Sequence, residues 1–282
     1  MKFQMAATQT ATSAPALLVG GRGLLESPRW HDGRLWFADW TAGEILALAS
    51  DGAVEVKARV QGAPLSFDFL PDGDLIVVSA REGRLLRQGR GGELEGYAEL
   101  APLAEGLWNE IVIDGLGNAY VNGGCLALVT PDGRTRRVAD SFAFPNGMAI
   151  TPDYRTLIVA ESHGRRLTGF DIAADGGLAN RWVWADLGDG VPDGICIDAE
   201  GCVWYADVPN RRCVRVREGG DVVRTVALDR GGFACMLGGP ERRTLYITAA
   251  QWFGMDRMGE MAGTGQVLSL EIEIPGAGWP YA

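Results

Sequence analysis

Histidine is scarce in this chain: its 282 residues include only two, His31 and His163. A zinc site built from several histidines is therefore excluded, and only these two residues are candidates for the base of a Ser-His-Asp triad. The five cysteines include no CxxC pair, and their number is odd. This pattern predicts reduced, mostly buried thiols in a cytoplasmic protein rather than a disulfide framework.

Basic residues and long apolar runs are also in short supply. The 26 Lys and Arg residues are outnumbered by 36 Asp and Glu, and the net charge of −10 argues against nucleic-acid and anionic-membrane partners. No apolar run reaches the roughly 18 residues of a transmembrane helix, and residues 1–15 hold no apolar stretch of signal-peptide length. These absences predict a cytoplasmic protein with a flexible N-terminal tail at 1–15, and they leave its oligomeric state open.

Glycine, by contrast, is abundant, and its positions follow a repeat. Six segments share a turn rich in Asp and Gly followed by a short apolar strand, and they recur every 38 to 46 residues. The segments are 31–39, 71–79, 114–122, 152–160, 198–206 and 239–248. A period near 42 residues with about four strands per unit is typical of a β-propeller blade. The sequence therefore predicts an all-β fold, a six-bladed β-propeller.

The predicted ring needs a closure, because a terminal blade would otherwise expose a pairing edge. An apolar segment at 16–21 lies before the first turn, and the segment 266–274 alternates apolar and polar residues as a half-buried strand does. We expect the N-terminal strand to join the last blade, which makes 16–282 a single propeller domain. Two separate β-sandwiches are the alternative, but no linker rich in Pro, Gly or Ser interrupts the repeat.

Polar residues precede the inner strands of four predicted blades. Counting back nine to eleven residues from the first apolar residue of each segment gives Glu26, Asn109, Asn146 and Asp193. Equivalent positions of a propeller converge on its axis, where two carboxylates and two amides need a common partner. A donor set of oxygens alone favours a hard cation, calcium or magnesium before manganese. The alternative is that each residue caps a turn, for which Pro-Asn-Gly and Pro-Asp-Gly are well suited.

Short motifs run in order along the chain: ESPRW at 26–30, WNE at 108–110, PNGMA at 145–149, TLIVAES at 156–162 and PDG at 192–194, with further ones at 204–207, 238–241 and 244–248. In this order and spacing, over roughly residues 20–270, they resemble the gluconolactonase, regucalcin (senescence marker protein) and luciferin-regenerating-enzyme superfamily. The resemblance implies a six-bladed propeller with one divalent cation in the channel mouth. Calcium is the first expectation, with magnesium, manganese, zinc or iron as alternatives.

The resemblance also implies a reaction and roles for individual residues. Glu26, Asn146 and Asp193 fall on the family's metal-ligand positions, and Asn109 falls on a position that contacts metal or substrate. The substrate would be a small-molecule lactone or ester whose carbonyl the cation polarises. Asp193 would be the catalytic residue, either as the general base that assists the attacking water or as a nucleophile. The implied enzyme is a metal-dependent lactonase.

One departure from the family concerns the substrate. Sugar-lactone members carry an arginine at the position of Leu107, which is followed here by Trp108. Leucine suits a less polar substrate, so a sugar lactone and a less polar lactone both stay open. We expect Leu107, Trp108 and Asn109 to contact substrate. His163 and Trp252 are further candidates at the channel mouth.

Two other functions are alternatives to a lactonase. One is a non-enzymatic propeller that binds calcium or serves as a scaffold. The other is a hydrolase that cleaves a non-lactone ester or an organophosphate at the same metal. A panel of lactones and esters with metal add-back separates the three.

Overall fold

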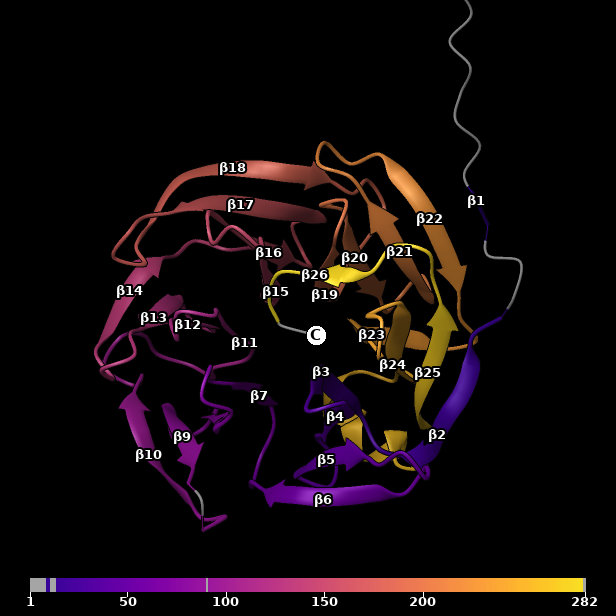
Figure 1. The fold of residues 1–282 in the computed structure, drawn as a ribbon, viewed down its shortest axis with the longest axis horizontal. Helices are drawn as coiled ribbons and strands as arrows, with labels where there is room; N and C mark the ends of the chain where they lie inside the picture. Colours follow the sequence, from indigo (N-terminus) through magenta and orange to yellow (C-terminus); the bar gives the residue numbers. More distant parts are fainter. Residues whose placement is uncertain (1–8, 11–13, 90, 281–282) are drawn as a thin grey trace, which may run out of the picture.

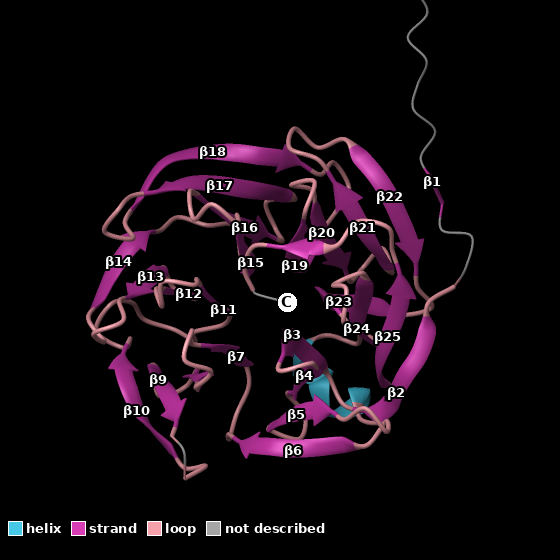
Figure 2. Cartoon of the chain, viewed as in Figure 1, coloured by secondary structure: helices cyan, strands magenta, loops and turns pink. Residues whose placement is uncertain are grey.

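The chain folds as a ring of six small β-sheets around a central channel, as the computed structural model of residues 9–10, 14–89 and 91–280 shows (Figure 1). The described residues contain a single helical segment, the 3₁₀ helix η1 (Met255–Met261), which lies beside the strands of the ring (Figure 2). None of their helices is long and apolar enough to cross a bilayer. The prediction of an all-β, six-bladed propeller is confirmed.

Each blade is an antiparallel sheet whose first strand lies next to the channel (Figure 1). Blade 1 holds β3 (Leu25–His31), β4 (Arg34–Asp39), β5 (Glu44–Leu48) and β6 (Val54–Arg59). Blade 2 holds β7 (Leu65–Phe69), β8 (Leu75–Ser79), β9 (Arg84–Gln88) and β10 (Leu94–Glu99). Blade 3 holds β11 (Ile111–Ile113), β12 (Ala119–Asn122), β13 (Leu126–Val129) and β14 (Thr135–Ala139).

The remaining blades repeat this order. Blade 4 holds β15 (Pro145–Ile150), β16 (Thr156–Glu161), β17 (Arg166–Ile172) and β18 (Leu178–Asp186). Blade 5 holds β19 (Pro192–Asp198), β20 (Val203–Asp207), β21 (Arg212–Val216) and β22 (Val222–Ala227), with β1 (Gln9–Thr10) paired in parallel at its outer edge. Blade 6 holds β23 (Gly231–Gly238), β24 (Thr244–Ala250), β25 (Gly265–Glu271) and β2 (Ala16–Arg22).

The ring closes as the sequence predicts. β2, from the N-terminal part of the chain, pairs antiparallel with β25, and Ala16 lies opposite Ser269. The last blade thus receives its outer strand from the start of the chain, which removes the open edge that β25 would otherwise present. The predicted flexible tail at 1–15 falls largely on residues 1–8 and 11–13, which lie outside the described residues, and it stays a prediction.

The core lies between the blades, where the apolar faces of neighbouring sheets meet. The first two strands of a blade are covered on both faces, so they read as nearly continuous apolar runs, such as LIVVS in the second strand β8 and GICID in the first strand β19. The five cysteines are buried and unpaired by disulfides, which confirms the predicted thiols. Cys196 and Cys235 pack against each other between blades 5 and 6, with their sulfur atoms 3.9 Å apart.

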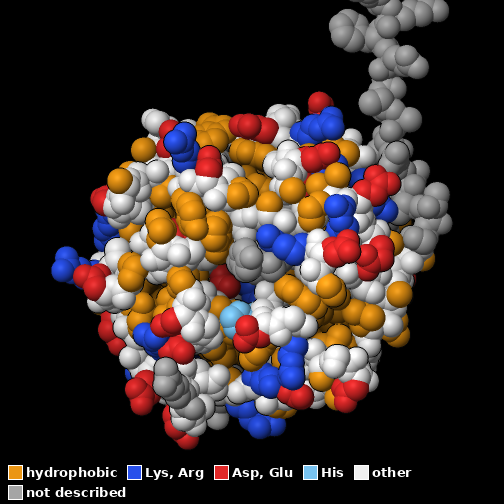
Figure 3. Space-filling view, viewed as in Figure 1, with side chains coloured by type: hydrophobic (Ala, Val, Ile, Leu, Met, Phe, Trp, Pro, Cys, Tyr) orange, Lys and Arg blue, Asp and Glu red, His pale blue; other side chains and the backbone are white. Residues whose placement is uncertain are grey.

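The C-terminal segment narrows one end of the channel. β26 (Gly276–Ala277) pairs with the end of β19, and Trp279 exchanges two backbone hydrogen bonds with Ile150 at the end of β15. The Trp279 ring packs on Tyr154, with ring centroids 4.5 Å apart. Figure 3 shows this face, where charged side chains of both signs lie among hydrophobic ones. The opposite end of the channel is formed by the first residues of the inner strands, and it holds the predicted site.

Ring closure makes a prediction for stability. Deletion of residues 1–22 removes β2 and exposes β25 together with the apolar side chains that Val19 covers. We therefore expect the melting temperature to fall by roughly 10 °C, or the protein to aggregate. Deletion of residues 1–13 is the matched control, because it keeps β2 and, among the described residues, removes the two-residue pairing of β1. Equal melting temperatures of the two truncated proteins in differential scanning calorimetry would show that the closure contributes no stability.

Candidate active site

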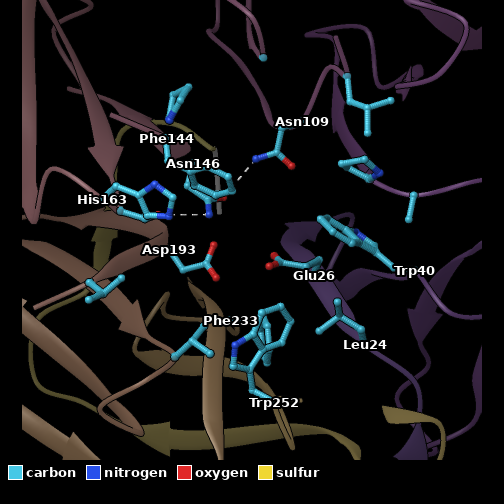
Figure 4. A pocket seen from close by; sticks show the side chains of 18 of the residues that line it. Leu24, Glu26, Trp40, Asn109, Phe144, Asn146, His163, Asp193, Phe233 and Trp252 are labelled. Carbon is cyan, nitrogen blue, oxygen red and sulfur yellow. Dashed lines mark hydrogen bonds between the residues drawn. The ribbon is translucent and has the colours of Figure 1, made fainter. Parts of the chain in front are cut away.

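A cavity of about 670 Å³ opens at the end of the channel where the inner strands begin. All six blades contribute lining residues, and these include seven of the predicted ones: Glu26, Leu107, Asn109, Asn146, His163, Asp193 and Trp252. Figure 4 shows the carboxylates of Glu26 and Asp193 turned toward the same open space, with Asn109 and Asn146 on its other side. The fold therefore brings together the four polar residues that the repeat singled out.

Bulges at the starts of the inner strands aim these side chains. The pairing register shifts between Glu26 and Arg29 in β3, between Pro145 and Met148 in β15, and between Pro192 and Ile195 in β19. A bulge adds a residue that has no partner opposite it and turns the local side chains away from the regular alternation. Asn146 and Asp193 each lie inside such a shift. The Pro-Asn-Gly and Pro-Asp-Gly tripeptides are therefore bulged strand starts and not turns.

Two glycines permit the close approach of adjacent inner strands at the site. A Cβ atom on Gly147 would lie 2.5 Å from the backbone nitrogen of Ile195, and one on Gly194 would lie 2.3 Å from the Cβ of Ala234. Neither separation is tolerated by real side chains. The glycine that follows Asn146 and the one that follows Asp193 thus let β15, β19 and β23 pack closely enough to share one cavity.

Of the two carboxyl groups of the site, that of Glu26 is buried and that of Asp193 is partly buried, and they are close enough to repel each other. Burial raises the pKa of Glu26 well above its usual value, and the charges of Asp193 and Glu110 raise it further. The pKa of Asp193 is also raised well above its usual value, by burial first and then by Glu110 and Asp207. One oxygen of Glu26 accepts a hydrogen bond from the backbone N–H of Ser27. Oδ1 of Asp193 is buried and has no hydrogen-bond partner among the described residues.

The amide side chains form the other side of the site. Asn109 donates from Nδ2 to Oδ1 of Asn146 at 3.3 Å, and Asn146 donates to the hydroxyl of Ser162 at 3.5 Å. Ser162 in turn donates to the carbonyl of Pro192, the residue before Asp193. Asn122 holds the backbone by donating to the carbonyl of Asn146 and accepting from the N–H of Glu110. β15 is therefore tied to blade 3 through Asn122, and β19 is tied to blade 4 through Ser162.

A buried charge network under the site was not foreseen from the sequence. Glu110 accepts hydrogen bonds from Arg29 at 2.8 Å and from the hydroxyl of Ser27 at 3.0 Å. Arg29 also lies 3.4 Å from Asp68, whose pKa burial raises to about 6 although the Arg29 charge lowers it. Its place in the WNE motif at 108–110, directly after Asn109, was the signal that could have found it.

Glu161, at the end of β16, anchors the loop that leads to Asn146. Burial alone would raise the pKa of this carboxyl, but hydrogen bonds lower it to about 2. The donors are Arg166, the backbone N–H of Ala143, Thr168 and Arg181. The contact with Ala143 fixes the segment just before Phe144 and Pro145, so Glu161 positions one wall of the cavity from behind.

The remaining predicted residues divide between the cavity and the core. Trp108 is 1% exposed and packs in the core between blades 2 and 3, so it does not line the cavity, and the prediction that it contacts substrate does not fit the structure. Its large apolar ring is more stable between the blades than at the water-filled mouth. Leu107, directly before it, does line the cavity and is half exposed. His163 stacks on Phe144 at 4.6 Å, and Trp252 packs edge-on against Phe233.

The donor set at the cavity fits a hard divalent cation. The unpaired Oδ1 of Asp193 and the repelling carboxylate of Glu26 both gain from a positive charge between them. Within the described residues, no group of three or more His, Cys, Asp and Glu side chains could hold a metal. The fit therefore depends on the amide oxygens of Asn146 and Asn109, which are ordinary ligands for calcium and magnesium.

Comparison with known proteins gives three consistent findings. Residues 24–251 match the family described as SMP-30/Gluconolactonase/LRE-like region. A 6-deoxy-6-sulfogluconolactonase of Pseudomonas putida is 26% identical over 273 residues, which cover 90% of this chain and 93% of that protein. The pentonolactonase XacC of Haloferax volcanii is 26% identical over 83% of this chain and 84% of its own length.

Among solved structures, a regucalcin of Agrobacterium tumefaciens, described as a calcium-binding protein, superposes with a TM-score of 0.78. It is 20% identical and covers 93% of this chain and 95% of its own. At this identity the likeness establishes the shared propeller fold and no more.

The anchoring role of Glu161 predicts a pH-dependent loss of stability. Glu161→Gln should lower the free energy of unfolding by roughly 3 kcal/mol at pH 7, because it removes a buried carboxylate from two arginines. The folded-state pKa of about 2 lies below the ordinary 4.5, so the contribution is fully present above about pH 4.5 and is lost as the pH falls toward 2. The difference from the unmutated protein should therefore shrink to roughly 1.5 kcal/mol at pH 3.

Urea unfolding at pH 7 and pH 3 measures this difference. Glu200→Gln is the matched control, since Glu200 also pairs with an arginine but is half exposed, and it should change stability far less than Glu161→Gln does. A Glu161→Gln difference that stays constant between the two pH values would contradict the assignment of its stability to the ionised carboxylate.

Proposed function

The chain belongs to the SMP-30/gluconolactonase/LRE-like family, and we propose that it is a divalent-cation-dependent hydrolase that opens a lactone ring. The observation that carries the proposal is the pair of carboxyl groups, of Glu26 and Asp193, that face one cavity together with two amides. Relatives named as a sulfogluconolactonase and a pentonolactonase support the reaction class.

Glu26, Asn146 and Asp193 would hold the cation, with Asn109 as a fourth ligand or a substrate contact. Calcium is the first candidate, because all four residues offer oxygen and because a regucalcin of the same fold is described as calcium-binding. A bound cation would polarise the lactone carbonyl and stabilise the negative charge that develops on its oxygen.

Asp193 is the proposed general base. Its carboxylate is turned into the cavity, where it can accept the proton of the attacking water (Figure 4). The water oxygen bonds to the carbonyl carbon, the bond between that carbon and the ring oxygen breaks, and the proton passes to the departing alkoxide. Ser162 and Gly194 keep the backbone on both sides of Asp193 in place, which fixes the direction of the carboxylate.

Cation dependence is the first test of this function. EDTA should abolish lactone opening, and added Ca²⁺, Mg²⁺ or Mn²⁺ should restore it, as followed by acid release in a weakly buffered assay. Asp193→Asn removes the base and should lower kcat by at least roughly 10³-fold, and Glu26→Gln should act through cation affinity. Full activity of both variants, or activity that EDTA leaves untouched, would overturn the proposal.

Thermal unfolding tests cation binding without turnover. A cation that binds only the folded state at 100 times its Kd should add about 2.7 kcal/mol to the stability of the unmutated protein. Asp193→Asn and Glu26→Gln should each lose most of this gain, and in EDTA they should be at least as stable as the unmutated protein because the repulsion between the carboxyl groups is gone. A cation-induced gain without hydrolysis of any lactone, aryl ester or phosphotriester would instead favour the non-enzymatic calcium-binding propeller.

A further inference from the structure

The cavity has two chemically different sides. One side carries the polar residues of the proposed reaction, and the other is an apolar wall formed by Leu24, Trp40, Phe233 and Trp252. Figure 4 shows Leu24, Phe233 and Trp252 on the far side of Glu26 and Asp193 from the two amides, with Trp40 beside Glu26. The two sides belong to one continuous space, so a molecule bound through its reacting group at Asp193 also meets the wall.

An enlarged connection in blade 6 builds part of the wall. In the other five blades the second and third strands are joined by three or four residues, whereas β24 and β25 are joined by the fourteen residues 251–264. This connection carries Trp252 and the 3₁₀ helix η1. Met258 and Met261 of η1 pack against Leu24 and Phe233 from behind. The wall is therefore backed by a second apolar layer and is not a single side chain at a loop tip.

The lining offers few groups for a polyhydroxylated substrate. In the described part of the chain none of the residues that line the cavity is a lysine or an arginine, and its ionisable groups are Glu26, Asp193 and His163. Ser162 already donates to a backbone carbonyl, and the two amides share a hydrogen bond. Each sugar hydroxyl placed against the apolar wall would lose its water without gaining a partner, which costs free energy.

The wall continues into an apolar rim at the mouth. Leu107, Phe144 and Trp252 line the cavity and are 51%, 51% and 41% exposed, and Phe253 beside them is 40% exposed. Exposed apolar side chains gathered around a cavity mark a surface that an apolar ligand covers. The volume of about 670 Å³ is within the range of sites that enclose small organic ligands.

We propose that the apolar wall is a binding subsite for an aliphatic or aryl substituent on the lactone, so that the substrate is an apolar lactone and not the lactone of a sugar acid. This inference rests on the proposed lactone hydrolysis. Trp252 and Phe233, which pack edge-on against each other, contact the substituent. The apolar wall then determines which lactone binds, and the carboxylates of Glu26 and Asp193 serve the reaction.

A homologous series of substrates tests the subsite. The probes are γ-butyrolactones with γ-alkyl chains of one to eight carbons, together with glucono-δ-lactone, assayed with the activating cation present. Each buried methylene should raise kcat/KM about fourfold until the chain fills the cavity. Trp252→Ala should lower kcat/KM for the octyl lactone at least tenfold more than for the methyl lactone. The non-hydrolysed γ-octyl lactam should inhibit competitively, and its Ki should rise in the same variant.

Leu116→Ala is the matched control, because Leu116 is an exposed leucine in the turn between β11 and β12 at the other end of the channel. It should leave the dependence on chain length unchanged, and the melting temperatures of both variants verify folding. A higher kcat/KM for gluconolactone than for the octyl lactone, with no dependence on chain length, would overturn the subsite while the lactonase stands. Absence of hydrolysis across the whole panel would overturn the proposed function itself.

Discussion

Two acidic side chains that face one cavity, and that repel each other when both are ionised, are the constraint on which this structure depends. Glu26 and Asp193 come from blades 1 and 5, and each raises the free energy of the other in its ionised form. Repulsion between buried carboxylates costs several kcal/mol in the absence of a partner, so the surrounding fold must hold them against separation. The closed ring does this, because the inner strands cannot move apart while β2 pairs with β25.

The charge network below the cavity increases the number of acidic groups that the fold must hold close together. Glu110 and Asp68 add two more buried acids, and among the described residues Arg29 is the cation that contacts both. One guanidinium does not balance four carboxyl groups, and a divalent cation at the mouth would bring the group close to neutrality. The network also fixes the backbone that carries Glu26, since Ser27 donates to Glu110. The same arrangement of charge that the fold must hold together is thus the one on which the proposed cation binding depends.

Much of the fold and the polar half of the site could be predicted from the sequence, because both follow from the repeat. The spacing of the turns sets the number of blades, and equivalent positions converge by symmetry, which is why Glu26, Asn146 and Asp193 were found without a structure. The bulges that aim Asn146 and Asp193 could not be predicted, since a bulge depends on the register of two strands and a Pro-X-Gly tripeptide also suits a turn. The predicted substrate contact of Trp108 does not fit for a related reason. Leu107 lines the cavity, whereas Trp108, one position further along the chain, packs in the core.

The apolar wall was the least predictable part, because contacts between different blades build it. Leu24 and Phe233 belong to the inner-strand region of blades 1 and 6, and Trp252 belongs to the long connection between β24 and β25. Gly254 and Gly263, both with positive φ, flank η1 and let this connection leave and rejoin the blade sharply. The bulges that contain Asn146 and Asp193 lie in β15 and β19, so the connection between β24 and β25 can change length and composition without moving Asp193. A relative can therefore share the reaction centre and differ in its substrate. For this reason a 26% identity to a sulfogluconolactonase and to a pentonolactonase is compatible with an apolar wall in the cavity of this chain.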